Sequence, residues 1–214
     1  MKAITLKAGR EKSATRRHPW VFSGAIDKVL GDPSLGDSVE IYSYAGDFLG
    51  MGAYSPSSQI RARFWNFEEK RIIDKEFLSK VLDQAIASRH SRGFDVSDKQ
   101  NAFRLVNAEN DGIPGCIIDK YGPYFSIEIL SAGAEVFREI IFKLLAEKTG
   151  CTGIIERSDS EVRTKEGLPL RKEVAYGNVP TDPVPMNENG IFFDIDLWNG
   201  HKTGYYLDQR DARK

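Results

Sequence analysis

The most reactive mixture of side chains in this sequence lies in its last fifteen residues, "GHKTGYYLDQRDARK". Residues 200–210 hold a His, a Lys, a Thr, two Tyr, an Asp, a Gln and an Arg. The two cations could face an acidic ligand, while Asp208 and Gln209 could hydrogen-bond a ribose or an amino-acid group. The same residues also suit the capped start of a helix with packed tyrosines. Both interpretations stay open on residue types alone.

A second stretch, "RRHPWVFSGAI" at 16–26, joins positive charge to an aromatic ring. Arg16 and Arg17 could meet phosphates, and Trp20 could stack on an unpaired base. Residues 1–26 carry six basic side chains and one acidic one, although the whole chain has a net charge of −1. A local basic face can still bind phosphate. The alternative is a solvated arm that leads into a core strand.

Cysteine and histidine offer little further chemistry. His18, His90 and His201 are far apart, and neither cysteine has a ligand at zinc-site spacing, so no metal site is predicted. Cys116 starts an apolar run, and Cys151 follows a helix end whose dipole raises a thiol pKa. Structural roles are predicted for both cysteines. The sequence also lacks a GxGxxG or GxxxxGK[ST] phosphate loop.

Length and composition indicate a globular protein of one large domain or two modest ones. The chain has 214 residues, 41% of them hydrophobic and 29% charged. It has no apolar run of the ~18 residues that a membrane helix needs, and its first residues have no apolar signal region. A cytoplasmic location without membrane contact is therefore predicted.

The elements that must position these stretches fall into two parts. In residues 1–70, short strands alternate with Gly, Pro and Asp turns, which predicts a small β barrel with Arg61 and Arg63 on one strand face. Residues 71–93 have a helical apolar stripe that ends near Gly93. Beyond it we expect strands at 102–109, 115–122, 124–130, 153–158 and 189–200, an inward-facing amphipathic helix at 134–150, and a Pro-rich irregular stretch at 167–186. This pattern predicts a small α+β domain.

Three motifs in fixed order carry a family resemblance: "R-x-HPWVFSGAI", "RLVNAENDGIPGCIIDKYG" and "G-x-KTGYYLDQR". Together they resemble the PUA-domain-containing, SAM-dependent 23S rRNA cytosine-C5 methyltransferases, from about residue 10 to residue 213. His201 stands where the family pattern has Gln, a departure at the cofactor edge.

The resemblance implies a division of the chain. Residues 1–70 match the PUA-like RNA-binding barrel, residues 71–198 match a linker helix and α+β connecting domain, and residues 199–214 match the start of the methyltransferase domain. The predicted fold class is therefore α+β, with the catalytic Rossmann-like domain absent and the catalytic residues beyond residue 214. The chain by itself is expected to be inactive.

The resemblance also implies ligands and contacts. Its cofactor is S-adenosyl-L-methionine (SAM), with weak or no binding expected from this chain alone. The cofactor-binding candidates are Lys202, Thr203, Gly204, Tyr206, Asp208, Gln209 and Arg210. The RNA-binding candidates are Arg10, Arg16, Arg17, His18, Trp20, Arg61 and Arg63.

The expected function is the RNA-binding and connecting portion of an enzyme that makes 5-methylcytosine in large-subunit rRNA. In that reaction a thiolate adds at carbon 6 of the cytosine, which makes carbon 5 nucleophilic towards the SAM methyl group. Two alternatives stay open: a stand-alone PUA-type RNA-binding adaptor without methyltransferase activity, and a protein-interaction module that forms a homodimer.

Overall fold

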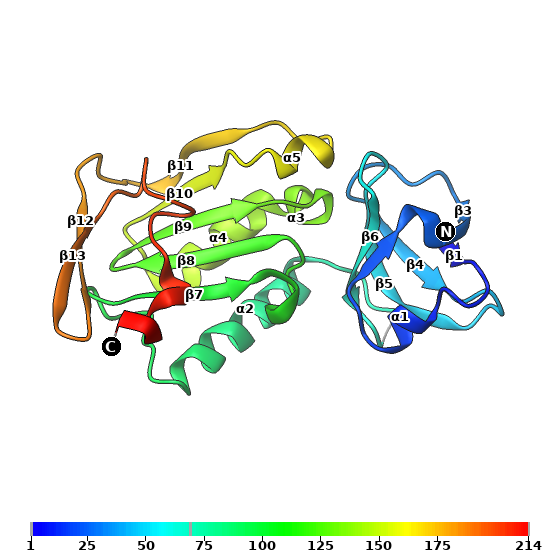
Figure 1. Ribbon diagram of the computed structural model, residues 1–214, viewed down its shortest axis with the longest axis horizontal. Helices are drawn as coiled ribbons and strands as arrows, with labels where there is room; N and C mark the ends of the chain where they lie inside the picture. Colours follow the sequence, from blue (N-terminus) through cyan, green and yellow to red (C-terminus); the bar gives the residue numbers. More distant parts are fainter. Residues whose placement is uncertain (1, 69, 214) are drawn as a thin grey trace.

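The computed structural model describes residues 2–68 and 70–213, which fold into two units lying side by side (Figure 1). The first unit consists of β1 (Ala3–Leu6), α1 (Lys12–Thr15), β2 (Trp20–Phe22), the 3-10 turn η1 (Ser23–Ala25), β3 (Ile26–Leu30), β4 (Ser38–Tyr42), β5 (Phe48–Tyr54) and β6 (Ile60–Asn66). Its six strands form one sheet in the order β2-β6-β5-β4-β1-β3. Because the outer strands β2 and β3 are joined by η1 alone, the sheet curls round on itself.

Alternating apolar residues build the core of this curled sheet. Val39 and Ile41 of β4 are fully buried in it, and Ala62 and Phe64 of β6 join them. The latter pair confirms the predicted apolar face of "IRARFW". Strand β1 has no counterpart among the predicted strands, because four residues are too short a run for alternation to be recognised.

The second unit is a five-stranded sheet with helices packed on one face (Figure 1). Its elements are α2 (Lys75–His90), β7 (Ala102–Asn107), η2 (Ala108–Asp111), β8 (Cys116–Tyr121), β9 (Tyr124–Ile129), α3 (Ala132–Val136), α4 (Arg138–Thr149), β10 (Gly153–Ser158), α5 (Val162–Lys165) and β11 (Arg171–Gly177). The strand order is β11-β10-β9-β8-β7. Side chains of α2 and α4 share one apolar cluster with those of β7, β8 and β9.

The topology of this unit departs from the predicted fold class. β9 and β10 pair in parallel, and the chain passes between them through α3 and α4. This is a β–α–β crossover, which parallel neighbours require. The prediction of a small connector with one helix between two groups of strands is wrong, because the helices form the crossover of a mixed, layered sheet.

Helix α2 follows its sequence pattern closely. Asp74 caps its start by accepting a hydrogen bond from the backbone N–H of Phe77 (2.8 Å). Leu78 and Leu82 of the predicted stripe are fully buried. The chain turns away through Gly93, whose φ of +83° suits a glycine after a helix end. None of the helices in the described part of the chain has the length and apolar character needed to cross a membrane.

The predicted helix at 134–150 is interrupted. The chain breaks at Phe137 into α3 and α4, and Ile141 and Leu145 of α4 are fully buried as expected. Val136 was expected to face inward, yet 55% of it is exposed. The break changes the direction of the helix axis, so the periodicity of α4 does not extend back to Val136.

The stretch predicted to be irregular holds two strands, β11 and β12 (Val184–Glu188), and β12 pairs with β13 (Ile191–Ile195). β11 is an exposed edge strand, so its side chains do not alternate between apolar and polar. The β12–β13 hairpin packs through Val184, Met186 and Ile195 onto Tyr121 and neighbouring residues of the sheet. This third apolar cluster supports the C-terminal segment.

Lys120 of β8 is a fully buried amine. Its ammonium donates to the Asp98 carbonyl and to Oδ1 of Asn101, and burial lowers its pKa from 10.5 to about 8. Between those values the unfolded chain binds more protons than the folded one, so this group makes stability rise with pH. We expect Lys120→Met to flatten that rise, by at most about 1.4 kcal/mol per pH unit. Urea unfolding at pH 8 and pH 10 measures the effect, and an identical pH dependence in parent and variant would refute it.

Candidate nucleic-acid interface and cofactor segment

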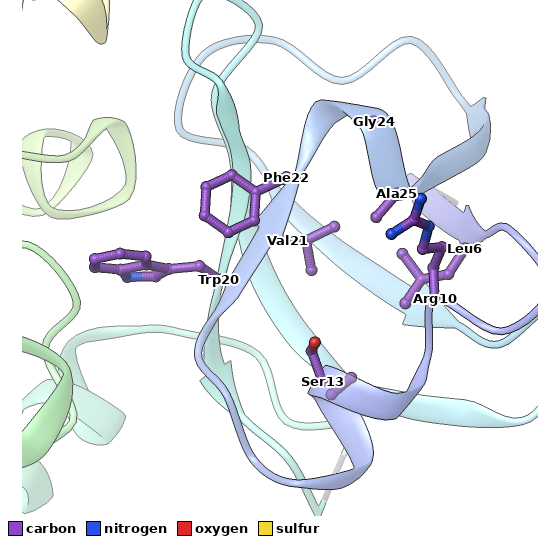
Figure 2. Close-up of a pocket in the computed structure, with 9 residues that line it drawn as sticks. Leu6, Arg10, Ser13, Trp20, Val21, Phe22, Gly24 and Ala25 are labelled. Carbon is purple, nitrogen blue, oxygen red and sulfur yellow. The ribbon is translucent and has the colours of Figure 1, made fainter.

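A pocket of about 230 Å³ opens beside β2 in the first unit (Figure 2). Figure 2 shows Trp20 and Phe22 on one side of the strand, with Arg10 on the opposite side of the pocket. The pocket thus joins apolar walls to one free guanidinium. Its lining residues are Leu6, Arg10, Ser13, Ala14, Trp20, Val21, Phe22, Gly24 and Ala25.

Three aromatic rings form a row along the side of β2 that faces the second unit (Figure 2). The ring centroids of His18 and Trp20 are 5.7 Å apart, and those of Trp20 and Phe22 are 6.3 Å apart. Trp20 is 37% exposed and Phe22 is 49% exposed, so both rings can stack on unpaired bases. Phe22 was missing from the predicted RNA contacts. Strand alternation is the signal that could have identified Phe22, because it places Phe22 on the same side of the strand as Trp20 and buries Val21 between them.

The arginines of the first unit that were predicted to contact RNA differ in whether they are free to bind a phosphate. Arg10 and Arg16 are exposed, and neither side chain has an ion pair or hydrogen bond with a residue that the structure describes. Arg17 forms an exposed ion pair with Glu68 (2.6 Å), and Arg61 donates to the backbone carbonyl of Pro56. Two guanidinium groups therefore stand ready for phosphate on this surface.

Arg63 lies in the contact between the two units. Its guanidinium donates two hydrogen bonds of 3.0 Å to the carboxylate of Glu166, and its Nε lies 3.8 Å from Glu109. Only 8% of Arg63 and 1% of Glu166 are exposed. Trp20 reaches the same place, because its Nε1 donates to Glu109 (2.8 Å). The structure thus places Arg63 away from the surface that carries Arg10 and Arg16.

Close packing accompanies these polar contacts. Gly133 of α3 lies so near β5 that an added Cβ would be 2.4 Å from Cβ of Ala53 and 3.0 Å from Nε1 of Trp65. Any larger residue would push the two units apart. Glu166 also accepts a hydrogen bond from the N–H of Ala132 at the start of α3 (3.3 Å). The two units are therefore joined by close packing at Gly133 together with the hydrogen bonds of Glu166.

In the C-terminal segment, Thr203 is almost fully buried and its hydroxyl is engaged. It donates to Asp119 (2.5 Å), and the Tyr121 hydroxyl lies 3.1 Å from it. Because ionised Asp119 can only accept, the Tyr121 O–H is the donor to Thr203, and the Tyr121 oxygen accepts from the N–H of Tyr205 (3.1 Å). Burial raises the pKa of Tyr121, which keeps this proton in place. Thr203 thus anchors the segment to β8.

Asp119 is the centre of this anchor. It is fully buried and also accepts two hydrogen bonds from Arg104, at 2.8 and 2.9 Å. These bonds raise the pKa of the Arg104 guanidinium. Gly204, with a φ of +145°, fits against Ile195 and Tyr121, where an added Cβ would be 3.2 and 3.4 Å from them. Sequence reasoning did not single out Asp119 and Arg104, although both lie in the motif "RLVNAENDGIPGCIIDKYG" that carries the family resemblance.

Other cofactor candidates stay at the surface. Lys202 bonds both oxygens of Asp208, at 3.1 and 3.2 Å, and its ammonium lies 4.6 Å from the Tyr206 ring centre. This bond lowers the pKa of Asp208. Tyr206, Asp208 and Gln209 are exposed, whereas Arg210 is partly buried. The segment therefore exposes the Tyr206 ring, the Asp208 carboxylate and the Gln209 amide to solvent, while Thr203 anchors it.

Both thiols are poorly suited to nucleophilic attack. Cys116 is fully buried, and burial raises its pKa strongly. Burial also raises the pKa of Cys151. Since the thiolate is the reactive form, neither cysteine is poised as a nucleophile, in agreement with the structural roles predicted for them.

Comparison with known proteins identifies the first unit. Residues 4–67 match the PUA-like domain family. This PUA-like unit contains the aromatic row of β2 and the exposed Arg10 and Arg16. The predicted small barrel at the N-terminus is thereby confirmed as a PUA-like domain.

Similarity to named proteins extends along the whole chain. The chain is 47% identical over 212 residues to ribosomal RNA large subunit methyltransferase I of Aliivibrio fischeri strain ES114, and 50% identical over 212 residues to that of Pseudoalteromonas translucida. Each alignment covers 99% of this chain and 53% of the relative. The chain thus spans about half the length of the curated relatives it matches.

Solved structures share the fold. A chain from Streptococcus mutans described as a candidate SAM-dependent methyltransferase superposes with a TM-score of 0.80 at 22% identity, over 100% of this chain and 53% of that one. A second, described as a methyltransferase complexed with SAH, gives the same TM-score over 52% of its length. The predicted fold class is wrong on this finding. The two units together share the fold of these chains over the whole of this one, so they are not a barrel beside a small α+β connector.

Proposed function

We propose that this chain binds rRNA and contributes to the SAM-dependent methylation of carbon 5 of cytosine in large-subunit rRNA. The supporting observation is that relatives named as large-subunit rRNA methyltransferases match 99% of the chain. In this proposal residues 1–70 bind RNA, residues 71–198 hold the C-terminal segment in place, and residues 199–214 form one edge of the cofactor pocket. A cytoplasmic location suits an rRNA substrate. The relatives give no support to the prediction that the chain by itself is inactive.

The RNA site that we propose is the exposed part of the aromatic row on β2, beside the second unit, with the adjoining pocket. His18, Trp20 and Phe22 offer ring faces to unpaired bases, and Arg10 and Arg16 offer guanidinium groups to the phosphates. Stacking and phosphate contacts together suit single-stranded RNA, in which the bases are free to turn outward.

The cofactor edge that we propose is the exposed part of the C-terminal segment. SAM supplies an electrophilic methyl group when bound. The Gln209 amide can hydrogen-bond ribose hydroxyls and the Tyr206 ring can pack against the adenine, whereas the Asp208 charge is held by Lys202. Thr203 and Gly204 act indirectly, because their contacts to β8 and β13 hold the segment in place.

RNA binding tests this proposal directly. We expect the chain to bind single-stranded rRNA fragments with a log affinity that falls linearly with log salt. Replacing both Arg10 and Arg16 with alanine should weaken binding about tenfold at low salt and reduce the salt slope by about 1.4, since each phosphate contact on a single strand contributes about 0.7. Fluorescence anisotropy between 50 and 200 mM salt measures both quantities.

The matched control is Lys143→Ala, which removes an exposed cation from α4 in the second unit. Its affinity should equal that of the parent. Equal affinity of the parent and the Arg10→Ala, Arg16→Ala variant would contradict the proposed RNA site. RNA binding that is unchanged by SAM, together with no heat of SAM binding in calorimetry, would favour an RNA adaptor instead.

A further inference from the structure

The structure points to a second RNA contact, in the second unit. Two cavities of about 300 and 420 Å³ are both lined by Phe94 and Arg210; the first lies against β7, and the second against the segment before β7 and the turn between β12 and β13. We infer that they form one groove that holds single-stranded RNA. This groove extends the proposed function, because it rests on the chain being an RNA-binding protein.

Arginine side chains characterise the first cavity. Arg89, Arg92, Arg104 and Arg210 line it, with Asp208 as its single acidic lining residue. Asp111 and Asp119 already neutralise Arg89 and Arg104. Arg92 is exposed and has no ion pair or side-chain hydrogen bond to any residue in the described ranges. The guanidinium of Arg92 is therefore available to bind a phosphate group.

Arg210 is less available than Arg92, because its Nη1 donates to the carbonyl of Ala102 at 3.4 Å, but its charge is only weakly paired. Its closest carboxylate contact is 3.9 Å, to Glu188, and Arg213 already binds that carboxylate through both oxygens, at 2.7 and 2.9 Å. Arg210 also stacks on Phe94, with 5.0 Å between its guanidinium carbon and the ring centre. The Asp208 charge is held by Lys202. A phosphate beside Arg92 and Arg210 thus meets two cations with little competition.

Amide side chains characterise the second cavity. Gln100 and Asn189 line it and are exposed, and their side chains have no hydrogen bond within the described part of the chain. Asp98, its acidic lining residue, accepts the backbone N–H of Gln100 (2.8 Å). Amides carry both donors and acceptors, which suits the edges of unpaired bases. Phe94 lies between the arginine and amide parts and supports the guanidinium of Arg210, on whose plane a base can stack.

The positive charge of the groove favours RNA over SAM as the molecule that it binds. SAM carries a sulfonium and an ammonium against one carboxylate, so a wall of guanidinium groups repels it. RNA offers a phosphate for every base and needs a ring and amides beside the cations. We therefore assign Arg210, predicted from the sequence as a cofactor contact, to RNA. The two cavities together suit an RNA strand of several nucleotides better than a single free nucleotide.

Two variants test the groove in the 214-residue chain. Arg92→Ala should weaken binding of a single-stranded rRNA fragment several-fold and reduce the salt slope by about 0.7. Phe94→Leu, which keeps an apolar side chain beside Phe103, should weaken it about tenfold through lost stacking. Lys143→Ala is the control, and thermal unfolding confirms that each variant is folded. RNA carrying 4-thiouridine should crosslink to the peptide that contains Phe94.

The outcomes separate this inference from the proposed function. If the Arg10→Ala, Arg16→Ala variant loses affinity while the Arg92 and Phe94 variants bind as the parent does, the groove is overturned and the function stands. If the parent binds no RNA, both are overturned. A mononucleotide is added at the same concentration of nucleotide units as the oligonucleotide. If it displaces the oligonucleotide, the groove binds free nucleotides and the inference of a groove for single-stranded RNA is overturned.

Discussion

Replacing Glu166 with alanine is expected to lower the free energy of unfolding by about 3–5 kcal/mol. Glu166 and Arg63 form a two-point ion pair between the units, and their side chains are only 2% and 10% exposed. Without Glu166, the guanidinium is left buried with one carboxylate contact, at 3.8 Å to Glu109. The cost comes from this unpaired charge. Urea unfolding followed by tryptophan fluorescence measures it.

The matched control is Glu68→Ala, which breaks the ion pair of the PUA-like unit with Arg17. Both side chains of that pair are about two-thirds exposed, at 66% and 67%. Solvent screens such a pair, so the loss should be below about 1 kcal/mol. A double variant, Arg63→Met with Glu166→Gln, should recover much of the loss because no charge remains buried. Equal losses for Glu166→Ala and Glu68→Ala would show that the contact between the units contributes nothing to stability.

Replacing Asp119 with alanine is expected to cost about 3 kcal/mol and to loosen the cofactor segment. The change removes three hydrogen bonds, two from Arg104 and one from Thr203. The loss is smaller than for Glu166 because Arg104 is 31% exposed and can turn to water. Hydrogen exchange of the backbone N–H of Tyr205, which bonds the Tyr121 hydroxyl, should become faster at the same time.

Asp83→Ala is the control for Asp119→Ala. Asp83 binds Lys148 at 2.7 Å and is 62% exposed, so its loss should change neither the stability nor the exchange at Tyr205 appreciably. Thr203→Val tests the anchor itself, since it removes the hydroxyl but keeps the volume. Faster exchange at Tyr205 in Thr203→Val would support the anchor, while unchanged exchange in both Asp119→Ala and Thr203→Val would refute it.

Several parts of the fold were readable from the sequence because their patterns are local. The strands of "SVEIYSY" and "IRARFW" follow from alternation, and α2 follows from its apolar stripe and Gly93. The interruption at Phe137 and strand β11 were not readable. The first depends on packing against the sheet, and the second is an edge strand without an apolar face.

The candidate sites divide in the same way. The cations and rings around β2 are close in the chain, so composition and spacing indicate Arg16, Arg17 and Trp20 as possible RNA contacts, and the family resemblance adds Arg10. Arg63 shares their residue type, yet its position opposite Glu166, 103 residues away, makes it a contact between the units. No pattern along one segment can reveal a partner at that separation.

By itself, the sequence determined the local elements, the basic and aromatic character of the N-terminal unit and the resemblance carried by three motifs. Only the tertiary structure decided which polar groups are available. It buries Thr203 against Asp119 and leaves Arg92, near Phe94, without a side-chain partner among the described residues. The physical reason is that a charged or polar group is free to bind only when no buried partner already satisfies it, and such partners are brought together by long-range packing.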